Sequence, residues 1–305
     1  MNAIALGVHV LDVLVRPVER IPEGQGGELV EEIKITAAGA AGGTALTLAK
    51  LGARVRSAGA VGTDATGDML LRLLKDAGID TSLLLRRDGV PTSATVLPIR
   101  PNGDRPALHV IGANGAYGVE DAPLDAIAEA DYLHFGGPEF MGGEAAARVL
   151  EHARANDVVT AADVLAPGEP GLLEWIALAL PHVDWFFPND EQVLAFTGAD
   201  DLEQGCRTLL ERGAGCVVAT RGAAGVLIVD ADGTEEVPAF QVDVVDTTGC
   251  GDSFVAGFLR GLSLGRSRRD AAVLGNAAAA LVAQGLGSDT GDFDLESADE
   301  FARSA

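Results

Sequence analysis

The chain has 305 residues, of which 48% are hydrophobic, and it carries a formal net charge of −23 at pH 7. The hydrophobic residues are spread along the whole sequence, which indicates a folded globular protein of one or two domains and excludes a disordered chain. So acidic a chain is a poor match for nucleic acid or for an anionic membrane surface, because both bind through clustered Lys and Arg side chains.

Residues 1–15 are apolar, but they lack a basic segment and include one histidine and one aspartate. They predict a strand and not a signal peptide, and no stretch of the sequence is long enough to span a membrane. The three cysteines, Cys206, Cys216 and Cys250, form neither a CxxC pair nor a cluster with zinc spacing, which fits a reducing compartment. We therefore expect a cytoplasmic protein.

Strand patterns alternate with helical patterns along most of the chain, which is typical of a parallel sheet covered by helices on both faces. The expected strands cover residues 3–11, 55–61, 131–137, 158–164, 183–189, 216–220 and 225–230. The expected helices cover residues 42–52, 66–78, 143–156, 172–180, 190–198, 202–213, 251–265 and 269–285.

Two segments, residues 27–36 and 93–111, break this alternation. The second contains the pair Asn102-Gly103 between two alternating runs, which predicts a hairpin turn. We expect a single domain over residues 1–305, with lid segments at approximately 12–36 and 90–112 forming a small sheet over a site. The alternative is that these segments are edge strands without a function.

The stretch DTTGCGDSF, residues 246–254, precedes an apolar helical run. Gly249 and Gly251 permit a positive φ and bring unpaired amides to the helix start, where the macrodipole favours an anion. Asp252 in this setting can accept a hydroxyl proton while the amides stabilise a phosphoryl group in transfer. The alternative is that Asp252 only stabilises the helix N-terminus.

Competing nucleotide and hydrolase motifs are absent from the sequence. There is no GxxxxGK[ST] loop, GCGDSF departs from GxGxxG, and H-E-x-x-H does not occur. The run GLSLG at residues 261–265 lies within an expected helix and not between a strand and a helix, so it is no nucleophile elbow. The three lysines, Lys34, Lys50 and Lys75, lie outside any P-loop context, so a phosphate site would use backbone amides, helix ends, arginine and metal.

DTTGCGDSF resembles the C-terminal signature D-T-x-G-A-G-D-x-F of the ribokinase-like (PfkB-type) carbohydrate kinases and departs from it only at Cys250. Four further segments resemble elements of that family in matching order, namely GGTALTLAKLG, AGAVGTDATGDMLLRLLKDAGID, PND and TRGAAG. The resemblance covers nearly the whole chain. It implies an α/β fold with a doubly wound, mainly parallel sheet, helices on both faces and a small β-sheet lid.

The resemblance also implies roles for individual residues. Asp252 would be the catalytic base, and Gly249, Cys250 and Gly251 would form the anion hole. The implied acceptor-binding residues are Asp12, Gly42, Gly43 and Thr44. Many members of the family have Asn in the Gly-Gly element, where this chain has Thr44 and Thr47. The implied ATP-binding residues are Asn189, Thr220, Gly222, Gly225 and Asn276. Arg221 is either a phosphate ligand or a solvated loop arginine.

The family's metal element is Asn-x-x-Glu, whereas here Asn189 is followed by Asp190, Glu191 and Gln192. Either Glu191 holds Mg²⁺ through water after a local shift, or Gln192 fills the position without charge. Asp246 and Thr248, with the loop at residues 285–288, correspond to a monovalent cation site, which implies K⁺.

We therefore expect ATP-dependent phosphorylation of the hydroxymethyl group of a sugar or sugar acid by in-line transfer, with Mg²⁺ as cofactor. The expected partners are this acceptor, ATP and a second copy of the chain, bound through the lid near residues 94–99. Two alternatives stay open, a nucleoside kinase and a non-catalytic binding protein of the same fold. The lid segments lack an aromatic residue to stack on a base, which favours a sugar.

Overall fold

The computed structural model describes residues 1–101, 103–165 and 171–304. Within these residues, nine strands form a large sheet in the order β13-β12-β11-β10-β9-β8-β1-β4-β5. Their bounds are β1 Asn2–Gly7, β4 Arg54–Gly62, β5 Asp80–Arg87, β8 Tyr132–Gly136, β9 Val159–Asp163, β10 Trp185–Phe186, β11 Cys216–Thr220, β12 Val226–Asp230 and β13 Gly233–Val237. From β5 to β11 all neighbouring strands are parallel, which confirms the expected doubly wound fold.

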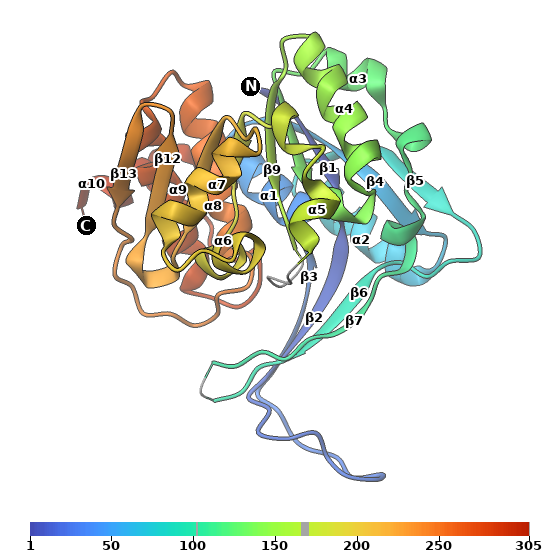
Figure 1. The fold of residues 1–305 in the computed structure, drawn as a ribbon. Helices are drawn as coiled ribbons and strands as arrows, with labels where there is room; N and C mark the ends of the chain where they lie inside the picture. The colour runs from blue at the N-terminus through green and yellow to red at the C-terminus, as the bar shows by residue number, and fades with distance from the viewer. Residues whose placement is uncertain (102, 166–170, 305) are drawn as a thin grey trace.

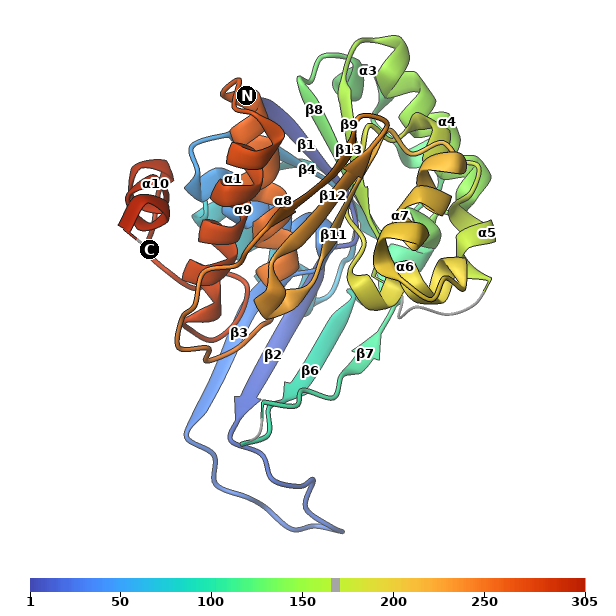
Figure 2. The same cartoon turned by 60° about the vertical axis from the view of Figure 1, so that its left-hand side comes forward.

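Helices cover both faces of the large sheet (Figure 2). One face carries α1 Ala40–Lys50, α2 Ala65–Asp76, α8 Cys250–Ser263 and α9 Arg268–Ala283, with α10 Leu295–Ser304 packed on α9. The other face carries α3 Leu124–Ala128, α4 Gly143–Ala155, α5 Leu172–Ile176, α6 Asp190–Thr197 and α7 Leu202–Glu211. Short 3₁₀ turns lie at η1 Gly112–Ala116, η2 Val119–Asp121, η3 Pro138–Phe140, η4 Leu180–His182 and η5 Gly222–Ala224.

The apolar strands supply a core on each side of the sheet. In β1, Ile4 and Leu6 join the cluster beneath α3 and α4, while Ala3 and Ala5 join the cluster beneath α1 and α2. Successive side chains of a strand point to opposite faces, so a strand covered on both faces is apolar throughout. The sequence of β1 therefore matches its central position.

A second sheet of four strands projects from the large one (Figure 1). Its strands are β2 Val10–Arg16, β3 Glu32–Ala38, β6 Ala94–Pro98 and β7 Leu108–Val110. The β6–β7 pair is antiparallel, as the hairpin prediction requires, although Asn102 itself lies outside the described residues. The two inserted segments join through β2 and β6, which pair in parallel, so the small sheet is mixed.

Several elements differ from the sequence predictions. The strand expected over residues 3–11 is divided into β1 and β2, which belong to different sheets, and β5, α3 and α10 were not anticipated. The edge strands β12 and β13 run antiparallel to their neighbours, and β13 was not anticipated. The helix expected over residues 172–180 ends at Ile176 and is followed by the 3₁₀ turn containing Pro181.

Among the described residues, no helix has the length and the apolar composition that crossing a bilayer requires.

Candidate active site

The anion hole predicted at residues 249–252 is the first turn of α8. Gly249 caps this helix with φ of 80°, a left-handed conformation that favours glycine. A β-carbon at Gly249 would also lie 2.6 Å from Oγ of Ser288, so the loop at residues 285–288 packs directly on the cap. The amides of Gly251 and Asp252 belong to the first turn, where no carbonyl four residues earlier is available inside the helix. These amides can bind an anion.

Asp252 lies where α8 meets the start of α1. A β-carbon at Gly43 would overlap the Asp252 carboxylate, and Thr44 Oγ1 donates to the backbone carbonyl of Asp252 over 3.4 Å. One turn further, the hydroxyls of Thr47 and Ser253 form a buried hydrogen bond of 2.9 Å. The Gly-Gly element thus lets α1 approach the predicted base closely, which brings Gly43, Thr44 and Asp252 together.

The pKa of Asp252 is raised well above its usual value, first by burial and then by the nearby carboxylates of Asp163 and Asp12. Asp163 ends β9, and its Oδ1 atom lies 3.2 Å from Nε2 of the buried His134 on β8. These strands bring their carboxyl ends to one edge of the sheet, where binding sites of doubly wound folds occur. Sequence reasoning missed Asp163 and His134, because nothing local distinguishes them from other strand residues.

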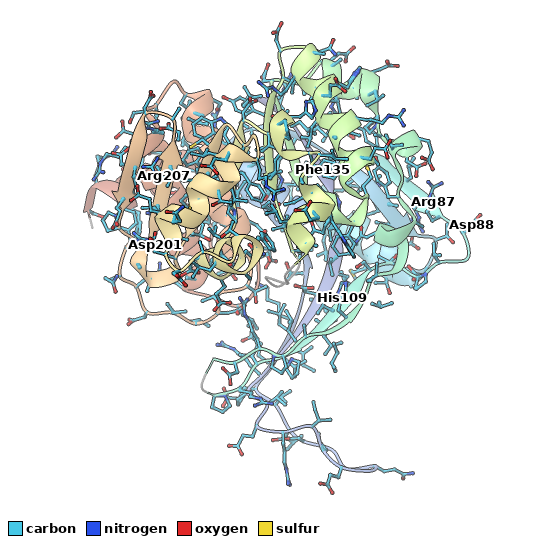
Figure 3. The ribbon with its side chains drawn as sticks, in the orientation of Figure 1. Arg87, Asp88, His109, Phe135, Asp201 and Arg207 are labelled. Atoms are coloured by element: carbon cyan, nitrogen blue, oxygen red, sulfur yellow. The ribbon has the colours of Figure 1, made fainter. Side chains whose placement is uncertain are left out.

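Asp12 lies on β2 and is only 6% exposed. Burial raises its pKa to about 6, although a hydrogen bond with Thr95 and the charge of Arg105 oppose the shift. In the small sheet Asp12 pairs with Thr36 on one side and with Thr95 on the other, and Thr95 pairs with His109 of β7 (Figure 3). This row of hydroxyl, carboxylate and imidazole groups lies on one face of the small sheet, because paired residues share a face.

Arg105 is a functional candidate that the sequence analysis did not identify. It belongs to the connection between β6 and β7, and its Nη1 donates to Thr248 Oγ1 over 2.6 Å. The same nitrogen lies 3.8 Å from Oδ1 of Asp246, and the guanidinium lowers the pKa values of Asp12 and Asp252. The small sheet therefore carries a cation into a cluster of carboxylates beside the anion hole.

Asp246 joins the anion-hole loop to the loop at residues 285–288. Its Oδ1 accepts hydrogen bonds from the amide and the hydroxyl of Thr248, at 3.1 and 2.9 Å. Its Oδ2 accepts from the amide of Gly287 at 3.0 Å. The structure thus brings together Asp246, Thr248 and the second loop. It also shows that both carboxylate oxygens of Asp246 have donors within the protein.

The residues assigned to ATP lie at the ends of β10 and β11. Asn189 and Thr220 form a parallel bridge, and the turn after Thr220 contains Gly222 with φ of 52° and Gly225 with φ of 86°. A β-carbon at Gly225 would overlap the carbonyl of Val237, so only glycine fits there. These four residues are neighbours, and their role in binding ATP stays a prediction.

Arg221 and Asn276 have partners inside the protein. Arg221 Nη2 donates to Glu236 Oε2 over 3.1 Å, across the β12–β13 pair that the sequence analysis did not anticipate. Asn276, on α9, donates through Nδ2 to the carbonyl of Pro238 over 2.9 Å. Both contacts stabilise the protein without a ligand, and they give each residue a structural function.

The metal element forms a capping box at the start of α6. Asn189 Oδ1 accepts from the amide of Gln192 at 2.7 Å, and Gln192 Oε1 accepts from the amide of Asn189 at 2.9 Å. Gln192 is buried and also donates to Val164 O over 3.0 Å, whereas Glu191 is exposed on the same helix. No group of three or more His, Cys, Asp or Glu side chains in the described residues could hold a metal ion.

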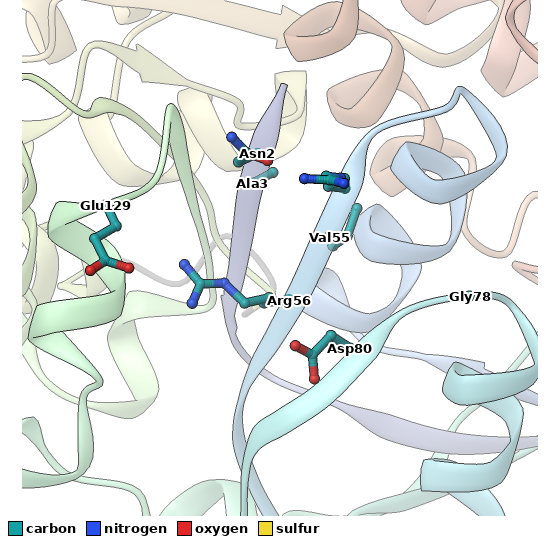
Figure 4. Close-up of a pocket in the computed structure, with 8 residues that line it drawn as sticks. Asn2, Ala3, Val55, Arg56, Gly78, Asp80 and Glu129 are labelled. Atoms are coloured by element: carbon teal, nitrogen blue, oxygen red, sulfur yellow. The ribbon is translucent and has the colours of Figure 1, made fainter.

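A separate pocket lies at the opposite edge of the large sheet (Figure 4). It is lined by the first residues of β1 and β4, including Asn2, Arg54 and Arg56, together with Asp80 and Glu129. This is the amino edge of the parallel strands, away from Asp163 and the anion hole. Its position argues against a role in the chemistry expected at the carboxyl edge.

A parallel sheet with an anion hole at a helix start, a buried acid beside it and a small sheet carrying polar groups toward it defines a phosphotransferase of the sugar-kinase class. The family model described as pfkB family carbohydrate kinase matches residues 6–293. The chain belongs to this family and is an ATP-dependent carbohydrate kinase.

The chain is similar to relatives named as sugar and nucleoside kinases. A deoxyribokinase of Salmonella typhi is 29% identical over 266 residues, which cover 85% of this chain and 84% of the relative. A nucleoside kinase of Methanothermobacter thermautotrophicus is 26% identical over 296 residues, which cover 95% of this chain and 91% of the relative. An Escherichia coli protein provisionally assigned as ribokinase II, solved with ATP and Mg²⁺, has the same fold, with a TM-score of 0.87, 20% identity and coverage of 100% and 99%.

Proposed function

We propose that the protein phosphorylates a hydroxymethyl group of a sugar or sugar acid, using ATP, by direct in-line transfer. The observation that carries this proposal is the position of Asp252, whose carboxylate packs on Gly43 of the acceptor-binding element while its amide belongs to the first turn of α8. Base and anion hole are therefore adjacent, as the attacking hydroxyl and the phosphorus must be.

In this proposal Asp252 accepts the proton of the acceptor hydroxyl as the oxygen attacks. The first-turn amides of α8 stabilise the charge on the transferred phosphoryl group. In comparable sites each such donor raises kcat by a factor of about 10²–10³. The carboxyl group must be ionised to act as a base, and its raised pKa makes it a stronger base than a solvated aspartate. Arg105 opposes that shift and so favours the ionised form.

Asp12 would bind acceptor hydroxyl groups through its two carboxylate oxygens. Gly42 and Gly43, at the start of α1, leave room for the acceptor to approach the backbone, and Thr44 fixes the distance between α1 and Asp252. The polar row on the small sheet, namely Thr36, Asp12, Thr95 and His109, would face the acceptor from the lid. A polar surface of this kind suits a sugar.

For the nucleotide, we propose that Asn189, Thr220, Gly222, Gly225 and Asn276 form the ATP side of the site. Mg²⁺ binds mostly through phosphate oxygens and water, so a single carboxylate acting through water is enough on the protein side. The exposed Glu191 beside Asn189 fits that role, whereas the buried Gln192 has no charge to offer. When bound with ATP, Mg²⁺ neutralises charge on the phosphates.

A nucleoside acceptor is the second candidate, and the kinship with a nucleoside kinase favours it. A bound base usually stacks on an aromatic side chain. Strands β2, β3, β6 and β7 contain no Phe, Tyr or Trp, and the imidazole of His109 is their one aromatic ring. We therefore place the sugar acceptor first, and a panel of acceptors separates the two.

We also propose that the small sheet forms a homodimer interface. The face opposite Asp12 presents the exposed apolar side chains Ile33, Ile35, Val96 and Leu108. Ile35 and Val96 each pair with Val13, and Leu108 pairs with Val96, so these side chains form one row. A second copy of the chain would cover this row. Light scattering of the wild type and of Val96→Asp tests the interface, and a wild-type monomer at micromolar concentration would overturn it.

The test of the kinase proposal measures ADP release from Mg²⁺-ATP with a panel of pentoses, hexoses, sugar acids and nucleosides. The expected result is turnover on one acceptor class that falls by about 10³ or more in Asp252→Asn. The matched control is Asp232→Asn, an exposed acid of the β12–β13 turn. Binding of ATP and sugar without ADP release from any acceptor would support a non-catalytic binding protein instead.

A further inference from the structure

We propose that the ammonium group of Lys34 replaces the monovalent cation at the Asp246 loop, so that turnover does not depend on added K⁺. Lys34 lies on β3, and its Nζ donates to Leu286 O over 2.6 Å and to Thr290 Oγ1 over 3.3 Å. The same ammonium lies 2.7 Å from Oδ1 of Asp289. A lysine of the small sheet therefore contacts a carbonyl of the loop that was assigned to K⁺, together with a carboxylate and a hydroxyl of the residues directly after it.

The oxygens around Asp246 already accept hydrogen bonds from groups of the protein. K⁺ sites in proteins are built from oxygen atoms that replace the hydration shell of the ion. Here Asp246 Oδ1 accepts from Thr248, Asp246 Oδ2 accepts from the amide of Gly287, and Leu286 O accepts from Lys34. These oxygens are already paired with donors of the protein. The guanidinium of Arg105 adds a second positive charge 3.8 Å from Asp246.

Lys50 holds the other end of the same loop. Its Nζ donates to the carbonyls of Asp289, Thr290 and Gly291 over 2.7, 2.7 and 2.6 Å. The ammonium also lies 4.8 Å from the centroid of the Phe293 ring, within the range of a cation–π interaction. An ammonium has three donors and no acceptor, so Lys50 uses its full capacity on this loop. Two of the three lysines of the chain thus bind one loop of eight residues, 285–292.

A continuous series of contacts connects Lys34 with the anion hole. Leu286 O binds Lys34, and the next residue, Gly287, donates its amide to Asp246. Asp246 in turn binds Thr248, and Ser288 packs on Gly249, the cap of α8. The positive charge that positions this loop therefore also positions the amides that would hold the phosphoryl group. Because this charge belongs to the chain itself, it positions the loop whichever salt is present.

The test compares the chlorides of potassium, sodium and tetramethylammonium at about 100 mM, which keeps screening constant. Two quantities are measured for the wild type, the thermal unfolding midpoint and the rate of ADP release. Both are expected to agree among the three salts, with rates within about twofold. An unfolding midpoint that rises only in potassium, or a rate about tenfold higher in potassium than in the other two salts, would overturn the proposal.

The variant Lys34→Met removes the ammonium and keeps an unbranched side chain. Its rate in tetramethylammonium is expected to fall by about tenfold or more, and potassium is expected to restore most of it. Lys75→Met is the matched control, because Lys75 is exposed in the last turn of α2, and the contacts of the loop with Lys34 and Lys50 involve no residue of that helix. Equal rates for Lys34→Met and the wild type in tetramethylammonium would contradict the proposal.

If Lys34→Met does not fold, the salt series of the wild type still tests the proposal. Equal midpoints and rates among the salts support the proposal, and a response specific to potassium overturns it. The rate measurement rests on the proposed kinase function, whereas the unfolding midpoint does not. A protein without turnover on any acceptor would contradict the proposed function, and its midpoint would still report whether potassium binds.

Discussion

The carboxylate of Asp252 occupies the space that a side chain at Gly43 would need, because a β-carbon there would overlap Oδ2. Gly43→Ala is therefore expected to displace the base or the start of α1 and to lower kcat/KM by about 10². In the neighbouring substitution Gly42→Ala, the new β-carbon would meet only His9, with Cδ2 at 3.5 Å and Cα at 3.9 Å, which are ordinary contacts. Its effect measures how closely the acceptor approaches this turn. Steady-state kinetics of both variants check the difference, and a fully active Gly43→Ala would contradict the position of Asp252.

The second prediction concerns the pH dependence of kcat/KM. Arg105 lowers the pKa of Asp252 and Asp163 raises it. Since the base must be ionised, activity is lost as the pH falls through this pKa. Arg105→Gln is expected to move the acidic limb to higher pH, and Asp163→Asn is expected to move it to lower pH.

Arg100→Gln serves as the control for this pair, because Arg100 is an exposed arginine of the same β6–β7 connection. Its pH profile should match that of the wild type. A limb that moves in the same direction for Arg105→Gln and Asp163→Asn would show that the charges of these two residues do not act on the base.

The third prediction concerns stability. Burial raises the pKa of Asp12 from 3.8 to about 6, so the folded state binds this proton more tightly than the unfolded state. The free energy of unfolding therefore falls as the pH rises between these two values, by about 3 kcal/mol at most. Asp12→Asn removes this penalty, and it should be more stable than the wild type at about pH 8 and similar near pH 4. Denaturant unfolding across this range checks the sign, and the same variant should lose acceptor binding.

The fourth prediction concerns Cys250, where the family signature has alanine. Its pKa is raised to about 12, mainly by burial, so the thiol is protonated and unreactive at neutral pH. Cys250 is the first residue of α8, and its Sγ contacts Ala279 O at 3.6 Å. Cys250→Ala should retain activity within about twofold, and the wild type should react slowly with iodoacetamide at about pH 8. Rapid inactivation that ATP prevents would contradict this.

Local patterns explain which features the sequence could predict. The alternation of apolar strands and helices predicted the parallel sheet, since that periodicity reflects burial on both faces. The glycine-capped start of α8 was predictable because the glycines, the acid and the apolar helical run are consecutive in the chain. The end of the helix near Ile176 was not, because apolar residues continue to Leu180 and only Pro181 marks the change.

The features that were missed depend on pairing between distant segments. Arg105 reaches Thr248 only because β2 and β6 join the two lid segments in parallel, and no local pattern indicates that register. Lys34 contacts Leu286 across 252 residues of sequence, where β3 meets the loop after α9, and no local pattern indicates this contact either. The partner of Arg221 lies on β13, a short strand whose exposed residues gave little apolar signal.

Asp12 and Arg105 are attached to neighbouring strands of the same small sheet, the first on β2 and the second after β6. Any movement of this sheet away from the large one would carry both side chains with it. In the proposed mechanism the acceptor would then lose its carboxylate ligand, and Asp252 would lose one negative and one positive neighbour together. Withdrawal of Asp12 lowers the pKa of Asp252 and withdrawal of Arg105 raises it, so the two changes oppose each other. Acceptor binding and the ionisation of the base would therefore both depend on where the small sheet lies.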